Sequence, residues 1–104
     1  MENSYGVNNI IPKTGSFGLL PSGLVLYNGM LVCDDGFSDT AAAAICREMG
    51  FYRSTSWNSG DSYGTSGYEI GLDEVNCSNT NWDSCTYETS HDCSRSESVK
   101  LSCV

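Results

Sequence analysis

The sequence has few positive charges and no long apolar run. Only 5 of its 104 residues are Lys or Arg, against 13 Asp or Glu, so the formal net charge is −8. A surface with this balance repels phosphate groups, which argues against nucleic acid as a partner and against docking on an anionic membrane. The apolar runs fall far short of the roughly 20 residues that a membrane-spanning helix needs, so we expect no direct insertion into a membrane.

Histidine and closely spaced cysteine pairs are also scarce. The chain has one histidine, His91, and no two of its cysteines have the two-residue spacing of a zinc site, so the zinc alternative is disfavoured. His91 has no nucleophile or base partner that the sequence identifies. We therefore predict no catalytic residues, no organic cofactor and no enzymatic activity.

Six cysteines stand out in a chain of 104 residues. An even number at scattered spacings is typical of a small secreted domain whose hydrophobic core alone is marginal. We expect one extracellular domain over residues 1–104, in which 1–16 form a loosely ordered lead-in and the core begins at about residue 17. Within the lead-in, Ile10 and Ile11 are candidates for an edge strand. The first ten residues lack the pattern of a signal peptide, so the extracellular assignment depends on the cysteines.

Local patterns predict short strands around a single helix. In GLVLYNGMLVC two β-rich runs flank Asn28-Gly29, which is a strong hairpin signal. Ser38 or Asp39 can cap a helix over about residues 39–49, with Gly50 as its stop. These elements, with further strands later in the chain, indicate the α+β class.

The second half of the chain has weaker signals. YEIGLDEVNC alternates, and this places Ile70, Leu72 and Val75 inward, while VKLSCV predicts a last strand. Trp82 lies three residues before Cys85 and is expected to fill the core. Other aromatic residues lie in a Gly- and Ser-rich segment, where they could either form a binding surface or pack over a thin core: Tyr52, Trp57, Tyr63 and Tyr68.

Several motifs together resemble a known family. Twelve residues separate Cys33 from Cys46, nine separate Cys93 from Cys103, and an LDxVxC block ends at Cys77. With the surrounding VCDDGFSDTAAAAICREMGF and HDCSRSESVKLSCV, they resemble the scavenger receptor cysteine-rich (SRCR) domain in its six-cysteine, group A-like form, from about residue 23 to 104. The resemblance implies a curved antiparallel sheet cradling one helix. It also implies three disulfides: Cys33 with Cys93, Cys46 with Cys103, and Cys77 with Cys85.

Some positions depart from the family pattern. Met30 and Leu31 stand where the family usually has a Trp-Gly pair, and Gly71 stands where it usually has Trp. The usual His and Asp on either side of the family's glutamate are replaced by Arg95 and Ser98. Loops near the ligand face are therefore expected to differ from those of other members.

The acidic pair Asp34-Asp35 needs a cap, a cation or bulk water around it, because neighbouring carboxylates repel each other. A bridge from Cys33 to Cys93 would bring Glu97 beside this pair. In the family, residues matching Asp34, Asp35 and Glu97 form a cation site used in ligand binding. The open alternatives are a solvated acidic patch and a helix cap.

A second family site would use Asp73 and Asp92, both of which are present. Oxygen ligands favour Ca²⁺, with Mg²⁺ as the alternative. Affinity is expected to be weak, with a dissociation constant of about 10⁻⁴ to 10⁻³ M as in extracellular calcium modules.

The resemblance implies an extracellular ligand-binding module of the scavenger or pattern-recognition type, as in innate immunity. Bound Ca²⁺ would hold anionic glycan, lipid or protein ligands on microbial surfaces, modified lipoproteins or glycoproteins. Such a module is expected to be part of a larger multidomain protein, secreted or in a receptor ectodomain. The alternative is a cation-independent adhesion or structural module that binds another protein.

Overall fold

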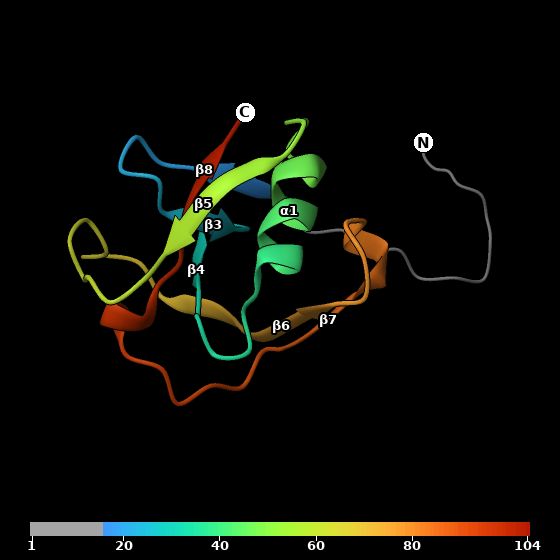
Figure 1. Cartoon of the computed structure of the whole chain (residues 1–104). Coiled ribbons are helices and arrows are strands. Elements are labelled where there is room, and N and C mark those ends of the chain that lie inside the picture. Colours follow the sequence, from blue (N-terminus) through green and yellow to red (C-terminus); the bar gives the residue numbers. More distant parts are fainter. Residues whose placement is uncertain (1–15) are drawn as a thin grey trace.

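The computed structural model describes residues 16–104. The expected lead-in, with Ile10 and Ile11, lies outside the described residues except for Ser16. The elements in chain order are β2 (Phe17–Leu19), β3 (Val25–Tyr27), β4 (Met30–Val32), α1 (Asp39–Glu48), β5 (Ser54–Asn58), β6 (Ile70–Cys77), the 3₁₀ turn η1 (Trp82–Ser84), β7 (Cys85–Glu88), the 3₁₀ turn η2 (Arg95–Glu97) and β8 (Lys100–Cys103) (Figure 1).

The strands form two sheets, and α1 packs against strands from both. One sheet has the order β2-β3-β4-β6-β7, and the other consists of β5 and β8. The predicted α+β class is confirmed, with one α-helix among residues 16–104. The antiparallel sheet implied by the resemblance is wrong at one pairing, because β4 and β6 run parallel, with Leu31 opposite Ile70 and Val32 opposite Leu72. The long connection through α1 and β5 returns the chain to the starting end of β4, which is what a parallel pair requires.

The predicted hairpin is confirmed between β3 and β4. Tyr27 lies opposite Met30, and the two turn residues Asn28 and Gly29 have φ angles of 53° and 81°. Two successive positive φ angles are the mark of a type I′ turn, which Asn-Gly adopts readily. The turn places Met30 at the start of β4, the central strand of the sheet, whose next neighbour is β6.

The helix begins at the predicted cap. The Ser38 hydroxyl accepts a hydrogen bond from the Ala41 N–H at 3.2 Å, and Gly50, with a φ of 96°, follows the C-cap Met49. The buried face of α1 consists of Ala41, Ala42, Ala44, Ile45 and Cys46. Three alanines on this face allow α1 to approach the strands closely, and the helix brings Cys46 to its disulfide partner.

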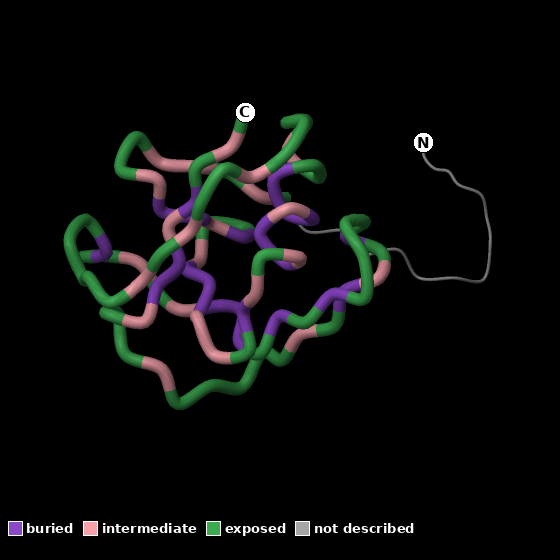
Figure 2. The backbone as a smooth tube through the Cα atoms, in the orientation of Figure 1, coloured by how far each residue is buried: buried purple, intermediate pink, exposed green. Residues whose placement is uncertain are grey.

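An aromatic cluster fills the core beside β7, and Trp82 lies at its centre. As predicted, Trp82 is buried, with 3% of its surface exposed. Its ring stacks on Tyr87 at 5.8 Å between centroids and meets Phe17 edge-on at 4.8 Å. Figure 2 shows the buried positions along α1 and the central strands, whereas residues 88–92 are exposed throughout.

Three disulfides hold these elements together. They join Cys33 to Cys93, Cys46 to Cys103 and Cys77 to Cys85, which is the pairing that the family resemblance implies. The first two close loops with sequence separations of 60 and 57 residues. In the chain-entropy model each of these two contributes roughly 4 kcal/mol to stability. The Cys33–Cys93 bond also fixes the segment before η2 against the end of β4.

Candidate metal site

The Cys33–Cys93 disulfide lies among acidic side chains from separate parts of the chain. Two overlapping groups have one candidate ligand atom per residue, with all atoms of a group within 4.8 Å of one another: Cys33, Asp35, Cys93 and Glu97 in the first, and Asp35, Asp73, Asp92 and Cys93 in the second. The sulfurs are in a disulfide and carry no thiolate charge, so the carboxylates are the relevant ligands. The carboxylate of Asp35 belongs to both groups.

Asp35 lies in the turn between β4 and α1. The carbonyl of Asp34 accepts a hydrogen bond from the Phe37 N–H at 3.0 Å, and Gly36 in this turn has a φ of 74°. The pKa of Asp35 is raised from its usual value of 3.8, first by partial loss of solvent and then by negative charges, of which Glu97 and Asp73 are the largest. A bound cation would relieve this repulsion.

Asp73 is the most buried carboxylate of the two groups, with 5% of its surface exposed. The next residue, Glu74, has a φ of 54°, at an irregularity in the pairing of β6 with β7. The Glu74 N–H donates to Asp73 Oδ1 at 2.7 Å, and no other protein partner of this carboxylate is recorded within residues 16–104. Burial of a charged carboxylate with a single hydrogen bond is costly, so a positive partner would stabilise it.

Asp92 and Glu97 reach the cluster from either side of Cys93. Asp92 ends the exposed segment after β7. Glu97 closes η2, and its Oε1 accepts a hydrogen bond from the Ser94 N–H at 2.7 Å. This capping contact holds Glu97 in place but occupies one of its two oxygens.

Asp34 points its carboxylate elsewhere. Its Oδ2 accepts a hydrogen bond from the Ser59 hydroxyl at 2.6 Å, while its backbone N–H donates to the Glu97 carbonyl at 2.8 Å. The Asp34 carboxylate is in neither acidic group. The structure thus brings Asp35 and Glu97 together as expected but leaves the Asp34 side chain outside the first group. The expected second pair, Asp73 and Asp92, lies in one group with Asp35.

The aromatic residues of the Gly- and Ser-rich segment divide between packing and exposure. Trp57 packs edge-on against Phe37 at 4.8 Å, and its Nε1 donates to Asp39 at 2.8 Å. Tyr52 and Tyr63 are 79% and 73% exposed. Trp57 therefore packs over the core, whereas the side chains of Tyr52 and Tyr63 are available for contact with a partner.

The fold and this cluster define a small α+β domain, held by three disulfides, with carboxylates gathered around one of the disulfides. The family model of the scavenger receptor cysteine-rich domain matches residues 24–104. The chain belongs to this SRCR family.

Individual proteins show the same relationship. Lysyl oxidase homolog 2 of Xenopus laevis is 37% identical over 85 residues, which cover 76% of this chain, and the human protein is 44% identical over 55 residues, which cover 51%. The matched regions are 11% and 7% of those relatives' lengths, so the chain corresponds to a small part of each.

A solved structure shares the fold. The dimeric form of the SRCR domain of mouse MARCO superposes with a TM-score of 0.58, and the match covers 94% of both chains at 24% identity. At this identity the likeness concerns the fold alone. Across residues 16–104, no helix has the length and apolar character to cross a membrane.

Proposed function

We propose that this domain is an extracellular binding module that uses bound Ca²⁺ to hold anionic ligands. The observation that carries the proposal is the group of Asp35, Asp73 and Asp92, three carboxylates with oxygens within 4.8 Å of one another. Oxygen ligands from separate parts of the chain suit Ca²⁺, which takes 6 to 8 oxygens, and Mg²⁺ is the alternative ion. Because the protein supplies only part of such a shell, water or a ligand oxygen would complete it.

The cation would also explain how an acidic protein can bind an anion. With a net charge of −8, the bare surface repels anionic groups. A Ca²⁺ ion with open coordination positions reverses the local charge and offers direct bonds to carboxylate, sulfate or phosphate oxygens. The ligands that fit are anionic groups on microbial surfaces, modified lipoproteins or glycoproteins, as expected of a scavenger or pattern-recognition module.

The same proposal covers the setting of the domain. Three disulfides require an oxidising compartment, and weak calcium affinity suits the millimolar calcium outside cells. Because the lysyl oxidase homologs are far longer than this chain, we place the domain within a larger secreted protein or receptor ectodomain, as a binding unit without catalytic residues of its own.

A calcium titration followed by amide NMR tests the cation site. Millimolar Ca²⁺ should shift the amides around Asp35, Asp73 and Cys93, and Asp35→Asn should weaken binding at least about tenfold, because this carboxylate belongs to both groups. Glu48→Gln, at the exposed end of α1, removes one negative charge away from the cluster and serves as the matched control. If calcium shifts nothing near Cys93, or if both variants weaken binding equally, the proposed site is wrong.

The alternative is cation-independent binding of another protein. The exposed rings of Tyr52 and Tyr63 favour it, because exposed tyrosines serve as contact anchors in protein interfaces. Chelation separates the two functions. Ligand binding that survives a calcium chelator but is lost in Tyr52→Ser or Tyr63→Ser would support the adhesion module instead.

A further inference from the structure

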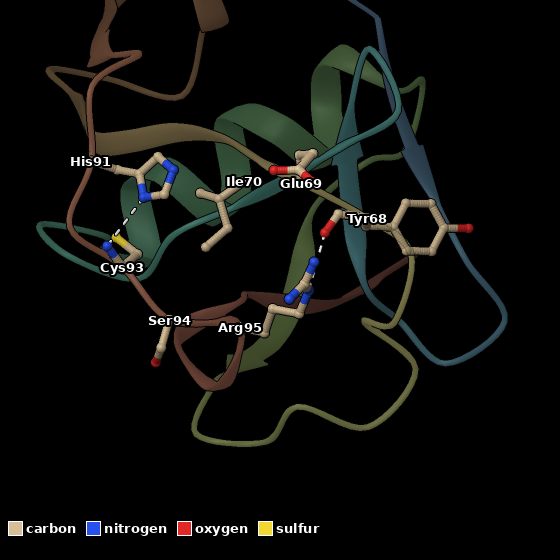
Figure 3. Close-up of a pocket in the computed structure, with 7 residues that line it drawn as sticks. All are labelled: Tyr68, Glu69, Ile70, His91, Cys93, Ser94 and Arg95. Atoms are coloured by element: carbon tan, nitrogen blue, oxygen red, sulfur yellow. Dashed lines mark hydrogen bonds between the residues drawn. The ribbon is translucent and has the colours of Figure 1, made fainter.

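A pocket of about 300 Å³ lies next to the acidic cluster, between the start of β6 and the segment that leads into η2 (Figure 3). Its walls come from Tyr68, Glu69, Ile70, His91, Cys93, Ser94 and Arg95. Cys93 belongs both to this wall and to the two acidic groups, so the pocket and the proposed cation site share an edge. The Cys33–Cys93 disulfide anchors that edge to the core.

Arg95 supplies positive charge at the pocket. Its Nε donates to the Tyr68 carbonyl at 3.1 Å, which fixes the plane of the guanidinium group. Within residues 16–104, Arg95 forms no salt bridge with a carboxylate. Its two terminal nitrogens donate to no acceptor in this part of the chain. A held guanidinium with free terminal nitrogens is suited to bidentate binding of a carboxylate.

His91 provides a second donor across the pocket. Its Nδ1 accepts a hydrogen bond from the Cys93 N–H at 3.1 Å, so the neutral ring carries its proton on Nε2. Ile70 lies between His91 and the guanidinium of Arg95, and the Tyr68 ring turns away (Figure 3). The pocket therefore offers two donors with an apolar side chain between them.

Glu69 completes the set with an acceptor. This exposed carboxylate would repel a uniformly acidic ligand but can accept hydrogen bonds from hydroxyl groups. A sugar acid has all the complementary features: one carboxylate for Arg95, hydroxyls for Glu69 and His91, and a C–H face for Ile70. An acidic peptide supplies carboxylates but lacks the hydroxyls.

We infer that this pocket binds a single sugar-acid residue of a glycan, beside the calcium site. This inference rests on the proposed function and deepens it by naming the class of ligand. Because Cys93 borders both the pocket and the acidic groups, the next sugar of the glycan would extend toward Asp92 and Asp35, where its oxygens can complete the calcium shell. Calcium and glycan should therefore increase each other's affinity.

The test uses the intact, disulfide-bonded domain and three probes in amide NMR titrations. The first probe is a tetrasaccharide of alternating uronic acid and N-acetyl amino sugar, the second is its methyl ester, and the third is a tetraglutamate peptide. The free-acid tetrasaccharide should shift the amides of Ile70, Ser94 and Arg95. The ester, which lacks the negative charge, should bind at least about tenfold more weakly.

Variants test the residues. Arg95→Gln should weaken tetrasaccharide binding about tenfold. Arg95→Lys should have an intermediate effect, because lysine keeps the positive charge but lacks the two parallel N–H donors of the guanidinium group. Arg53→Gln is the matched control, since Arg53 is exposed and does not line the pocket. Equal weakening by Arg95→Gln and Arg53→Gln, equal binding of acid and ester, or tighter Arg95-dependent binding of the peptide would overturn the inference.

The calcium experiment separates this inference from the proposed function. Arg95→Gln should keep its calcium shifts around Asp35, so loss of the tetrasaccharide alone assigns the effect to the pocket. Calcium shifts without any tetrasaccharide shift at Ile70 or Arg95 would overturn the glycan inference and leave the cation site standing. Arg95-dependent tetrasaccharide binding without any calcium shift would support the pocket and refute the proposed calcium dependence.

Discussion

Gly71 in β6 leaves no room for a larger side chain, and we predict that Gly71→Ala destabilises the domain. A Cβ atom at this position would lie 2.6 Å from the Cβ of Met30 and 2.9 Å from its Cε. The Cβ of Met30 is fixed by the backbone of β4, so a rotamer change cannot relieve the contact. Overpacking of this kind typically costs about 1–3 kcal/mol, and we expect a loss in this range.

Denaturant unfolding with the disulfides intact measures this loss. Gly18→Ala is the matched control, because a Cβ at Gly18 has no atom within 4 Å, and it should change stability by less than about 1 kcal/mol. Adding Met30→Gly removes the opposing Cβ, so the double variant should recover about 1 kcal/mol or more relative to the sum of the single changes. A Gly71→Ala protein as stable as the Gly18→Ala protein, or strictly additive changes, would refute the proposed contact.

Three further predictions concern the disulfides, the core and pH. Reduction of all three disulfides should unfold the domain, as seen by loss of amide dispersion, whereas Cys77→Ser with Cys85→Ser should leave it folded, since that bond closes a separation of only 8 residues. Ser98→Ala should be neutral or stabilising by up to about 1 kcal/mol in denaturant unfolding, because its buried hydroxyl has no partner within residues 16–104; a loss above this would show a hidden hydrogen bond. Because the native pKa of Asp35 is raised above 3.8, its contribution to calcium-free stability should be largest below pH 3.8 and should fall as pH rises through the native pKa. Unfolding of wild type and Asp35→Asn across this range checks the sign, and a contribution from Asp35 that grows with pH would contradict it.

Local signals in the sequence predicted the elements that depend on local interactions. Asn28-Gly29 specifies its hairpin through turn geometry, and Ser38 specifies the start of α1 through one hydrogen bond to the backbone. The disulfide pairing came from the family resemblance, because spacing alone leaves fifteen pairings of six cysteines open. The parallel pairing of β4 with β6 depends on the route of the chain between them, which no local pattern records.

The composition of the acidic cluster could be predicted only partly from the sequence. The sequence pattern placed Ile70, Leu72 and Val75 inward along β6, and Asp73 was not among these positions. In the structure Gly71, Leu72 and Asp73 are buried in succession, and Glu74 after them has a positive φ of 54°. A glutamate gives no sequence signal for this conformation, which Gly, Asn or Asp adopts more readily.

The two departures from the family pattern next to the hairpin can be explained together. Met30 and Leu31 stand in place of the usual Trp-Gly pair, and Gly71 stands in place of Trp. In the structure the Met30 side chain occupies the space above Gly71, within 3.0 Å of where a Cβ would lie. With Met30 in this place, only glycine fits at position 71 without a shift of β4.

The shared position of Asp35 sets the order in which the two acidic groups would fill. A single carboxylate bridging two cations must offset their mutual repulsion, so we expect one calcium to bind well before a second. The group of Asp35, Asp73 and Asp92 offers three carboxylates, and Asp73 gains most from a cation because it is buried. The other group offers Asp35 and Glu97, and one oxygen of Glu97 already accepts the Ser94 N–H. The first calcium should therefore bind at the three-carboxylate group, so that Asp73→Asn weakens the first step of a titration and Glu97→Gln affects mainly the second. The opposite order would show that ligand count and burial do not decide occupancy here.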